Sequence, residues 1–236
     1  IDDPESCRNE PLNSILLGCM AAILIVLEED SDWLAARGAD WWQRWCWYIL
    51  RELPHATSGE PKELQHTLLS LLTSKVPDNV RDELTRLASS GATDTGHLLS
   101  SLLRLMDQCP DSVLDERLCE MLSAGEVAPP HLSTVMHFVL DRLPETARAA
   151  CEQIIDDPGP DDDESPAVLA ATALLFECPA ESAPVVLRFI AAHEGHGRQV
   201  LQQFAHGARW RSRSDDSTRP LDHLTPLQWG ELAGLL

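Results

Sequence analysis

The sequence predicts an all-α protein built as an α-solenoid of about 11–12 helices. Four prolines, Pro77, Pro110, Pro144 and Pro179, recur at intervals of 33, 34 and 35 residues. Before each proline, the residues at positions −1, −5 and −8 form one apolar helix face. After three of the four prolines, positions +7 and +10 are also apolar, and the second unit places its apolar residues one position later. Each unit is therefore predicted to be a helix, a tight proline turn and a second helix.

Apolar periodicity and helix-start residues place the helices in chain order. The first is expected from Asn13 to Glu29, and a second follows the Ser31-Asp32 cap and continues to about Leu53. Prolines at first-turn positions support several of the later starts. The later helices are expected at residues 61–75, 78–89, 95–107, 111–123, 129–142, 145–155, 166–177, 180–192 and 196–208, with a last one opening at Thr225-Pro226.

The proline repeat divides the chain into two predicted parts. Residues 1–59 are expected to form N-terminal helices that pack on the repeats, because Pro61 interrupts the pattern that Pro54 would begin. Residues 60–236 are expected to form a degenerate helical-repeat array. Two loops should interrupt this array, an acidic segment with prolines near 156–165 and a segment without apolar periodicity at 207–224.

The second predicted helix is dense in aromatic residues. Trp41, Trp45 and Tyr48 share one helix face, whereas Trp47 points elsewhere. This density predicts that the helix is covered on more than one side, yet aromatic residues also concentrate at binding hot spots. Trp47 is expected to be the most exposed of the group, which makes it a candidate partner-binding residue.

Composition limits the partners and the compartment. The chain has 18 basic and 38 acidic residues, a net charge of −20, which disfavours binding to nucleic acid. Its longest apolar stretch, Ile15 to Leu27, is too short to cross a bilayer. Seven cysteines occur singly, without a C-x-x-C pair, as is typical of buried thiols in a reducing compartment. We expect a cytoplasmic protein with no membrane partner.

Catalytic motifs are not found in the sequence. Neither Lys62 nor Lys75 stands in a phosphate-binding loop, and there is no G-x-S-x-G or H-E-x-x-H pattern. His193, Glu194 and His196 could face one metal ion, but the glycine between them favours a helix end instead. We therefore expect no catalytic residue, cofactor or metal site, with a metal-dependent hydrolase as the weaker alternative.

One short basic stretch stands out in this acidic chain. Arg209, Trp210, Arg211 and Arg213 supply three cations and an aromatic ring within five residues. They are candidate partner-binding residues that would recognise an acidic segment or a phosphate. The alternative, which the global negative charge favours, is a loop whose arginines pair with nearby aspartates.

The C-terminal segment Asp222–Leu232, DHLTPLQWGEL, resembles a short stretch in helical-repeat regions that follow NACHT-type NTPase modules in bacteria. The likeness is an L-T-x-x-Q-x-x-x-L helix opening, and the preceding helix pairs look like degenerate HEAT-like or TPR-like repeats. The resemblance implies an NLR-like antiviral or signalling STAND-type ATPase, in which the repeats act as a sensor and the ATPase lies outside this fragment. It assigns no functional residue.

These observations predict a non-catalytic protein-interaction or sensor region that recognises a protein ligand and controls an attached module. A structural assembly scaffold is the alternative. Because the sequence begins with Ile1 and ends inside an apolar pattern at Leu236, we expect a piece of a longer chain, whose remainder is a second partner. At the −5 position of the repeat, Leu105 and Leu174 are expected to be buried between helices.

Overall fold

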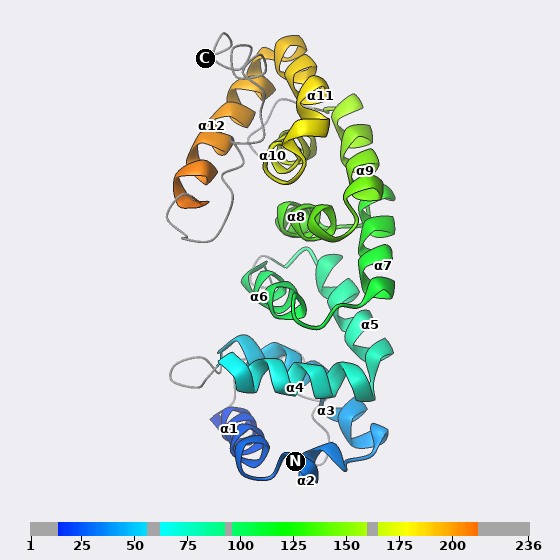
Figure 1. Ribbon diagram of the computed structural model, residues 1–236, viewed down its shortest axis with the longest axis vertical. Coiled ribbons are helices and arrows are strands. Elements are labelled where there is room, and N and C mark those ends of the chain that lie inside the picture. Colours follow the sequence, from blue (N-terminus) through cyan, green and yellow to red (C-terminus); the bar gives the residue numbers. More distant parts are fainter. Residues whose placement is uncertain (1–13, 56–61, 93–95, 160–164, 212–236) are drawn as a thin grey trace. The chain divides into compact units, whose positions relative to one another are not determined.

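The computed structural model describes residues 14–55, 62–92, 96–159 and 165–211, and these residues are almost entirely helical (Figure 1). Within these ranges there are twelve α-helices, two short 3₁₀ turns and no strand, so the predicted all-α class is confirmed. The elements are α1 (Ser14–Glu29), α2 (Ser31–Ala35), α3 (Ala39–Glu52), η2 (Leu53–His55), α4 (Lys62–Lys75), α5 (Pro77–Ala88), α6 (Gly96–Met106), α7 (Ser112–Ser123), η4 (Pro129–His131), α8 (Leu132–Arg142), α9 (Pro144–Asp156), α10 (Pro166–Glu177), α11 (Pro179–Ala192) and α12 (Glu194–Arg211).

The chain divides into two compact units, Ile1–Leu114 and Asp115–Leu236. This boundary falls inside α7 and differs from the predicted division between residues 59 and 60. The predicted division marks where the proline repeat starts. Because α3 packs against both α4 and α5, the N-terminal helices and the first repeat belong to one compact unit.

Three of the four repeat prolines stand at the first position of a helix, one residue after the preceding helix ends. The link residues before them are Val76, Leu143 and Cys178. Their φ angles lie between −142° and −128° and their ψ angles between 50° and 58°. Proline fixes its own φ and disfavours the helical conformation for the residue before it. The same residue pair therefore ends one helix and starts the next.

Hydrogen bonds at these links satisfy both helix ends. Each link N–H donates to the carbonyl at the −5 position over 2.7 to 2.9 Å, and each link carbonyl accepts from the residue four places on. The −5 residues Leu72, Val139 and Leu174 are completely buried. His193 joins α11 to α12 with the same bonds but without a proline. This link starts α12 at Glu194, two residues earlier than the sequence predicts.

Pro110 departs from this pattern. Helix α6 ends at Met106 and α7 begins at Ser112, so the connection is longer and Pro110 precedes the helix instead of opening it. The apolar positions of this unit are displaced as a result. Met106 is 1% exposed, whereas Leu105 beside it is only half-buried. The prediction that Leu105 is buried between helices is therefore wrong.

Helix α7 is started by a capping aspartate, Asp111, and not by a proline at its first position. Its Oδ1 accepts hydrogen bonds from the backbone N–H groups of Val113 and Leu114, each at 3.2 Å. Its Oδ2 accepts a hydrogen bond from Nε of Arg81 in α5 at 2.8 Å. Burial opposes ionisation of Asp111, but the bond from Arg81 and the backbone bonds outweigh it and lower the pKa of this carboxyl.

Replacing Asp111 by alanine should lower the free energy of unfolding by about 1–3 kcal/mol at neutral pH. Because the pKa of Asp111 is lower in the folded than in the unfolded state, its ionised form stabilises the fold above the unfolded pKa. This contribution is lost as the pH falls through the folded-state pKa. Urea denaturation between about pH 5 and pH 2 should therefore show the difference between the two proteins shrinking.

Asp111→Asn is the matched control, because asparagine keeps a capping oxygen but loses the charge that binds Arg81. We expect Asp111→Asn to cost less than Asp111→Ala at neutral pH. A difference between wild type and Asp111→Ala that stays constant across this pH range would contradict the assigned role of the carboxylate.

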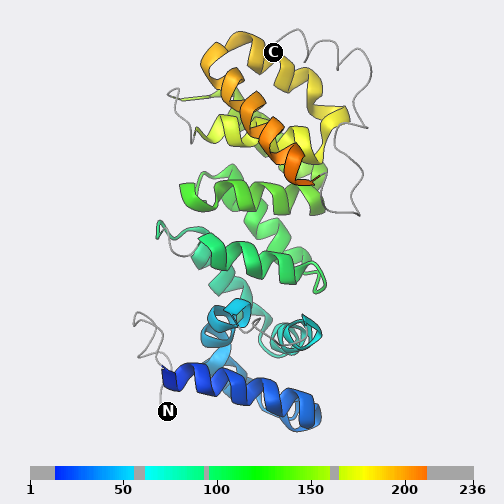
Figure 2. The same cartoon turned by 90° about the vertical axis from the view of Figure 1, so that its left-hand side faces the viewer.

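In the second unit, α10 is surrounded by other helices. It packs against α8, α9, α11 and α12, which lie around it in the ribbon (Figure 2). Nearly all of its residues after Pro166 are buried. Its sequence is apolar on every side, as such a central position requires. Each helix from α10 to α12 packs against the two helices that precede it. Contacts in this unit are therefore made between near neighbours in the chain.

Two other predicted boundaries differ from the structure. The single helix expected from residue 31 to 53 is two helices, because Gly38 is extended and starts α3 after a short α2. Residues 207–211, expected to open a loop, continue α12. The 156–165 connection lies between α9 and α10 as predicted, with residues 160–164 outside the described part. The rest of the 207–224 loop and the helix expected at Thr225 also lie outside it.

Candidate functional site

Helix α1 has an apolar side that no other described part of the chain covers. Met20, Leu24 and Leu27 are buried, but Ile25 is 52% exposed. The other exposed residues on this side are the small residues Gly18, Ala21 and Ala22. No charged residue occurs in α1 before Glu28. This side of α1 therefore has the apolar composition of a buried surface, although it is exposed to solvent.

Helix α2, which packs against α1, carries a second large apolar residue that is exposed. Asp30 caps α2 by accepting a hydrogen bond from the backbone N–H of Trp33 at 3.0 Å. The Trp33 side chain is 47% exposed, and the guanidinium carbon of Arg37 lies 3.4 Å from its ring centroid. This distance indicates a cation–π contact. We call the exposed side of α1 (Gly18, Ala21, Ala22, Ile25) together with Trp33 the N-terminal face.

The aromatic residues of α3 are mostly part of the core. Trp42, Trp47 and Tyr48 are buried, and Trp41 and Trp45 are half-buried. The expectation that Trp47 is the most exposed of the group is wrong. Because α3 packs against α1 as well as α4 and α5, sides of the helix that point in different directions are covered. Trp47 is only 7% exposed, and the predicted burial of the cluster on several sides is confirmed.

The buried ring of Tyr48 supports this assignment. Its pKa is raised far above the ordinary value by burial and then by the negative charge of Glu52. The phenol therefore stays protonated even well above neutral pH. Rings of Trp45 and Trp47 flank it edge-on, with centroids 5.7 and 6.0 Å away. These contacts are typical of aromatic packing within a core.

The basic candidates belong to the other unit. Arg209, Trp210 and Arg211 form the last described turn of α12, so they belong to a helix and not to the predicted loop. Arg213 lies outside the described residues. Trp47 and the basic stretch therefore belong to different units, and their roles in binding stay predictions.

The histidine pair considered as a metal site lies at the link between α11 and α12. The rings of His193 and His196 are 5.9 Å apart, and each packs beside Phe189. Glu194 pairs with Arg198 at 3.2 Å and is almost fully exposed. Across the described residues, no group of three or more His, Cys, Asp or Glu side chains is arranged to hold a metal ion.

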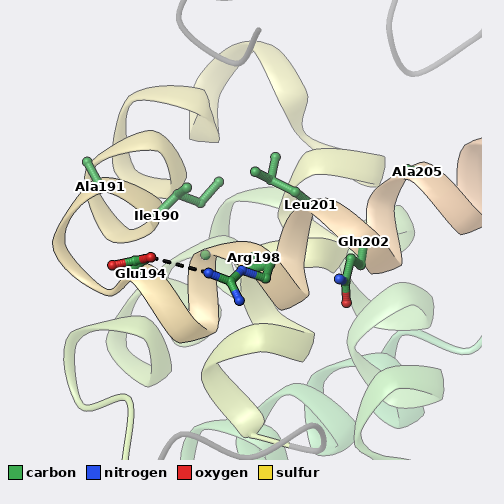
Figure 3. Close-up of a pocket in the computed structure, with 8 residues that line it drawn as sticks. Ile190, Ala191, Glu194, Arg198, Leu201, Gln202 and Ala205 are labelled. Carbon is green, nitrogen blue, oxygen red and sulfur yellow. Dashed lines mark hydrogen bonds and ion pairs between the residues drawn. The ribbon is translucent and has the colours of Figure 1, made fainter. Parts of the chain in front are cut away.

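A hollow of about 620 Å³ runs along α11 and α12 (Figure 3). Ile190 and Leu201 supply apolar surface, and Glu194 and Arg198, which form an ion pair, also line the hollow. Such an exposed pair contributes little to binding or stability. The described lining of the hollow contains no Ser, Thr, Tyr, Cys, His or Lys side chain.

Most described cysteines are packed inside the protein. Burial raises the pKa of the Cys151 thiol to about 12, and it also raises the pKa values of Cys119 and Cys178. Cys46 is buried as well, whereas Cys19 and Cys109 are half-buried. Thiols kept protonated in this way are poor nucleophiles. The predicted burial is therefore confirmed for four of the six described cysteines.

The sequence analysis did not identify the N-terminal face. The apolar composition of α1 on all sides was a usable signal, because such a helix is expected to be covered everywhere.

No described helix has the length and apolar character needed to span a membrane. Comparison of the sequence with models of known protein families gives no match, and neither the curated proteins nor the solved structures yield a significant match.

Proposed function

We propose that this chain is a protein-interaction module that binds a protein partner through its N-terminal face. The observation that carries the proposal is the exposure of Ile25 on the apolar helix α1 and of Trp33 on α2, which packs against α1. Exposed apolar patches on soluble proteins mark interaction sites. Tryptophan and arginine are also the residues most often found at binding hot spots, which suits the stacked pair of Trp33 and Arg37.

We also propose that the helices of this chain form an α-solenoid of antiparallel pairs. The one-residue links at Val76, Leu143 and Cys178 have nearly the same dihedral angles, which supports a repeated turn between paired helices. The near-neighbour packing from α8 to α12 is also typical of stacked repeats.

We propose further that partner binding controls an attached module. If the partner binds one state of a larger protein better than another, it shifts that protein toward the preferred state. The resemblance of residues 222–232 to repeat regions beside NACHT-type NTPases makes an NTPase the first module to test. The measurement is ATP turnover of the longer chain with and without the partner, which should change only when the N-terminal face is intact.

The interaction itself is tested by a double substitution, Ile25→Ser with Trp33→Ala. The variant should bind a partner identified by affinity purification at least about tenfold more weakly, because both exposed anchors are lost. Its free energy of unfolding should change by less than about 1 kcal/mol, since both side chains are exposed. Binding is measured by calorimetry with the purified partner.

Val113→Ala is the matched control, because Val113 is 49% exposed but lies on α7, away from α1 and α2 in the sequence. This variant should bind the partner as the wild type does. Equal affinities for all three proteins would remove the N-terminal face as the binding site.

A further inference from the structure

A second surface, in the unit Asp115–Leu236, combines a recess with uncompensated negative charge. A groove of about 570 Å³ lies between α7 and the start of α9. Cys119, Leu143 and Thr146 contribute to its lining, and Glu116 and Glu120 belong to the same groove. Cys119 is buried, so part of the groove is backed by the core of the unit.

Glu116 and Glu120 carry the charge of this groove, which we call the acidic groove. They are one helical turn apart on α7, where like charges repel each other. Both are exposed, and neither forms an ion pair with any side chain in the described ranges. The pKa of the Cys119 thiol is raised mainly by burial and to a smaller extent by the negative charge of Glu120. The groove therefore suits a cationic occupant with an apolar part.

The chain itself contains a segment of this chemistry. The stretch from Arg209 to Arg213, RWRSR, supplies three guanidinium groups and one indole ring within five residues of a chain with net charge −20. Arginine binds carboxylates through two parallel hydrogen bonds, and the indole can cover apolar surface. Complementary charge of this kind fixes specificity and raises association rates.

Within one molecule, the described part of this segment, residues 209–211, belongs to α12 and not to the helices that form the groove. Helix α12, which ends at Arg211, packs against α10 and α11. The groove is formed by α7 and α9, and α10 lies between α9 and α12 (Figure 1). A basic segment in the groove would therefore come from another molecule.

We propose that the acidic groove binds the Arg209–Arg213 segment of a second copy of this chain, which links copies head to tail. Each copy carries both the groove and the segment, so the contact joins two different surfaces and can repeat. Contacts of this heterologous kind close into rings or extend as filaments. Glu116 and Glu120 would bind arginines of the next copy, while the lining near Leu143 would contact its Trp210. The proposal uses neither Ile25 nor Trp33, so it stands or falls independently of the N-terminal face.

The first test measures binding of a labelled peptide with the sequence of His206–Arg213, HGARWRSR, by fluorescence polarisation. The receptor is the full chain with Arg209→Glu, Arg211→Glu and Arg213→Glu, which removes competition from its own segment. Adding Glu116→Lys and Glu120→Lys should weaken peptide binding by about tenfold or more. Binding should also weaken as salt is added, because the contact is electrostatic.

Glu28→Lys with Glu29→Lys is the matched control, since it makes the same change in net charge on exposed residues of α1. It should change peptide affinity by less than about twofold, since screening weakens distant exposed charges. An equal loss in both double variants would show attraction to the whole acidic protein and would overturn the proposal.

The second test is a charge exchange followed by sedimentation velocity. The wild type should form assemblies at high concentration, and Glu116→Arg with Glu120→Arg should dissociate them to monomers. Combining these changes with Arg209→Glu, Arg211→Glu and Arg213→Glu should restore assembly, because the charges are complementary again. A monomeric wild type, or no recovery in the exchanged chain with unchanged circular dichroism, would contradict the proposal. Ile25→Ser with Trp33→Ala should leave assembly unchanged.

Discussion

Leu174→Ala is expected to lower the free energy of unfolding by about 2–5 kcal/mol, the largest effect among the single substitutions considered. Leu174 is completely buried in α10, the helix that α8, α9, α11 and α12 surround. Removing three side-chain carbons there leaves a cavity that these helices can fill only in part. The carbonyl of Leu174 also accepts the hydrogen bond from the link residue Cys178, so its backbone is fixed at the turn. Urea denaturation followed by circular dichroism measures the loss.

Leu105→Ala provides the comparison at the equivalent repeat position. Because Leu105 is half-buried, its truncation should cost about 1 kcal/mol or less. Met106→Ala in the same helix should behave like Leu174→Ala, since Met106 is 1% exposed. If Leu105→Ala cost as much as Leu174→Ala, the displaced apolar register before Pro110 would be incorrect.

Gly197→Ala is expected to destabilise the protein by about 1–3 kcal/mol. A Cβ atom at Gly197 would lie 2.7 Å from the carbonyl oxygen of Ile190 and 3.0 Å from its Cα. Both atoms belong to the backbone of α11, so no side-chain rotation can make room. The first turns of α12 would have to move away from α11, although alanine is the better helix former by about 1 kcal/mol. The hollow along these helices should widen, and hydrogen exchange in α12 should accelerate.

The same substitution at Gly18 should have the opposite sign. A Cβ atom there meets nothing within 4 Å, and Gly18 lies inside α1. Gly18→Ala should therefore stabilise the protein by about 0.5–1 kcal/mol through the higher helix propensity of alanine. Thermal unfolding of both variants measures the contrast. Stabilisation by Gly197→Ala would contradict the close approach of α11 and α12.

Local sequence chemistry accounts for the part of the fold that could be predicted. Pro77, Pro144 and Pro179 limit their own conformation and that of the preceding residue, so each turn is determined by two neighbouring residues. The helix boundaries around these prolines agree with the predicted ones to within two residues. Pro110 has the same sequence context, but Asp111 caps the next helix by binding the N–H groups of Val113 and Leu114, and its second oxygen binds Arg81, 30 residues away. That exception depends on tertiary structure and could not be derived from the repeat.

Exposure depends on packing between helices and was harder to predict. Trp47 and Trp33 are both tryptophans on helices of the first unit, yet one is 7% and the other 47% exposed. The difference arises because α3 has neighbours on several sides, whereas Trp33 lies on α2, a helix of five residues. The acidic groove also depends on packing between helices, because it forms only where α7 and the start of α9 lie together. Periodicity identifies the inner side of each helix but not which outer sides meet.

Photo-cross-linking from the N-terminal face tests the proposed interaction most directly. A photoreactive amino acid is placed at position 25, at position 33 or, as control, at position 113, all of which carry exposed side chains in the wild type. The chain is then irradiated in the cells that produce it, and the adducts are identified by mass spectrometry. Positions 25 and 33 should yield an adduct with the same protein, and position 113 should not. Adducts that are absent from positions 25 and 33, or equally abundant from position 113, would contradict the assignment of this face as the partner-binding surface.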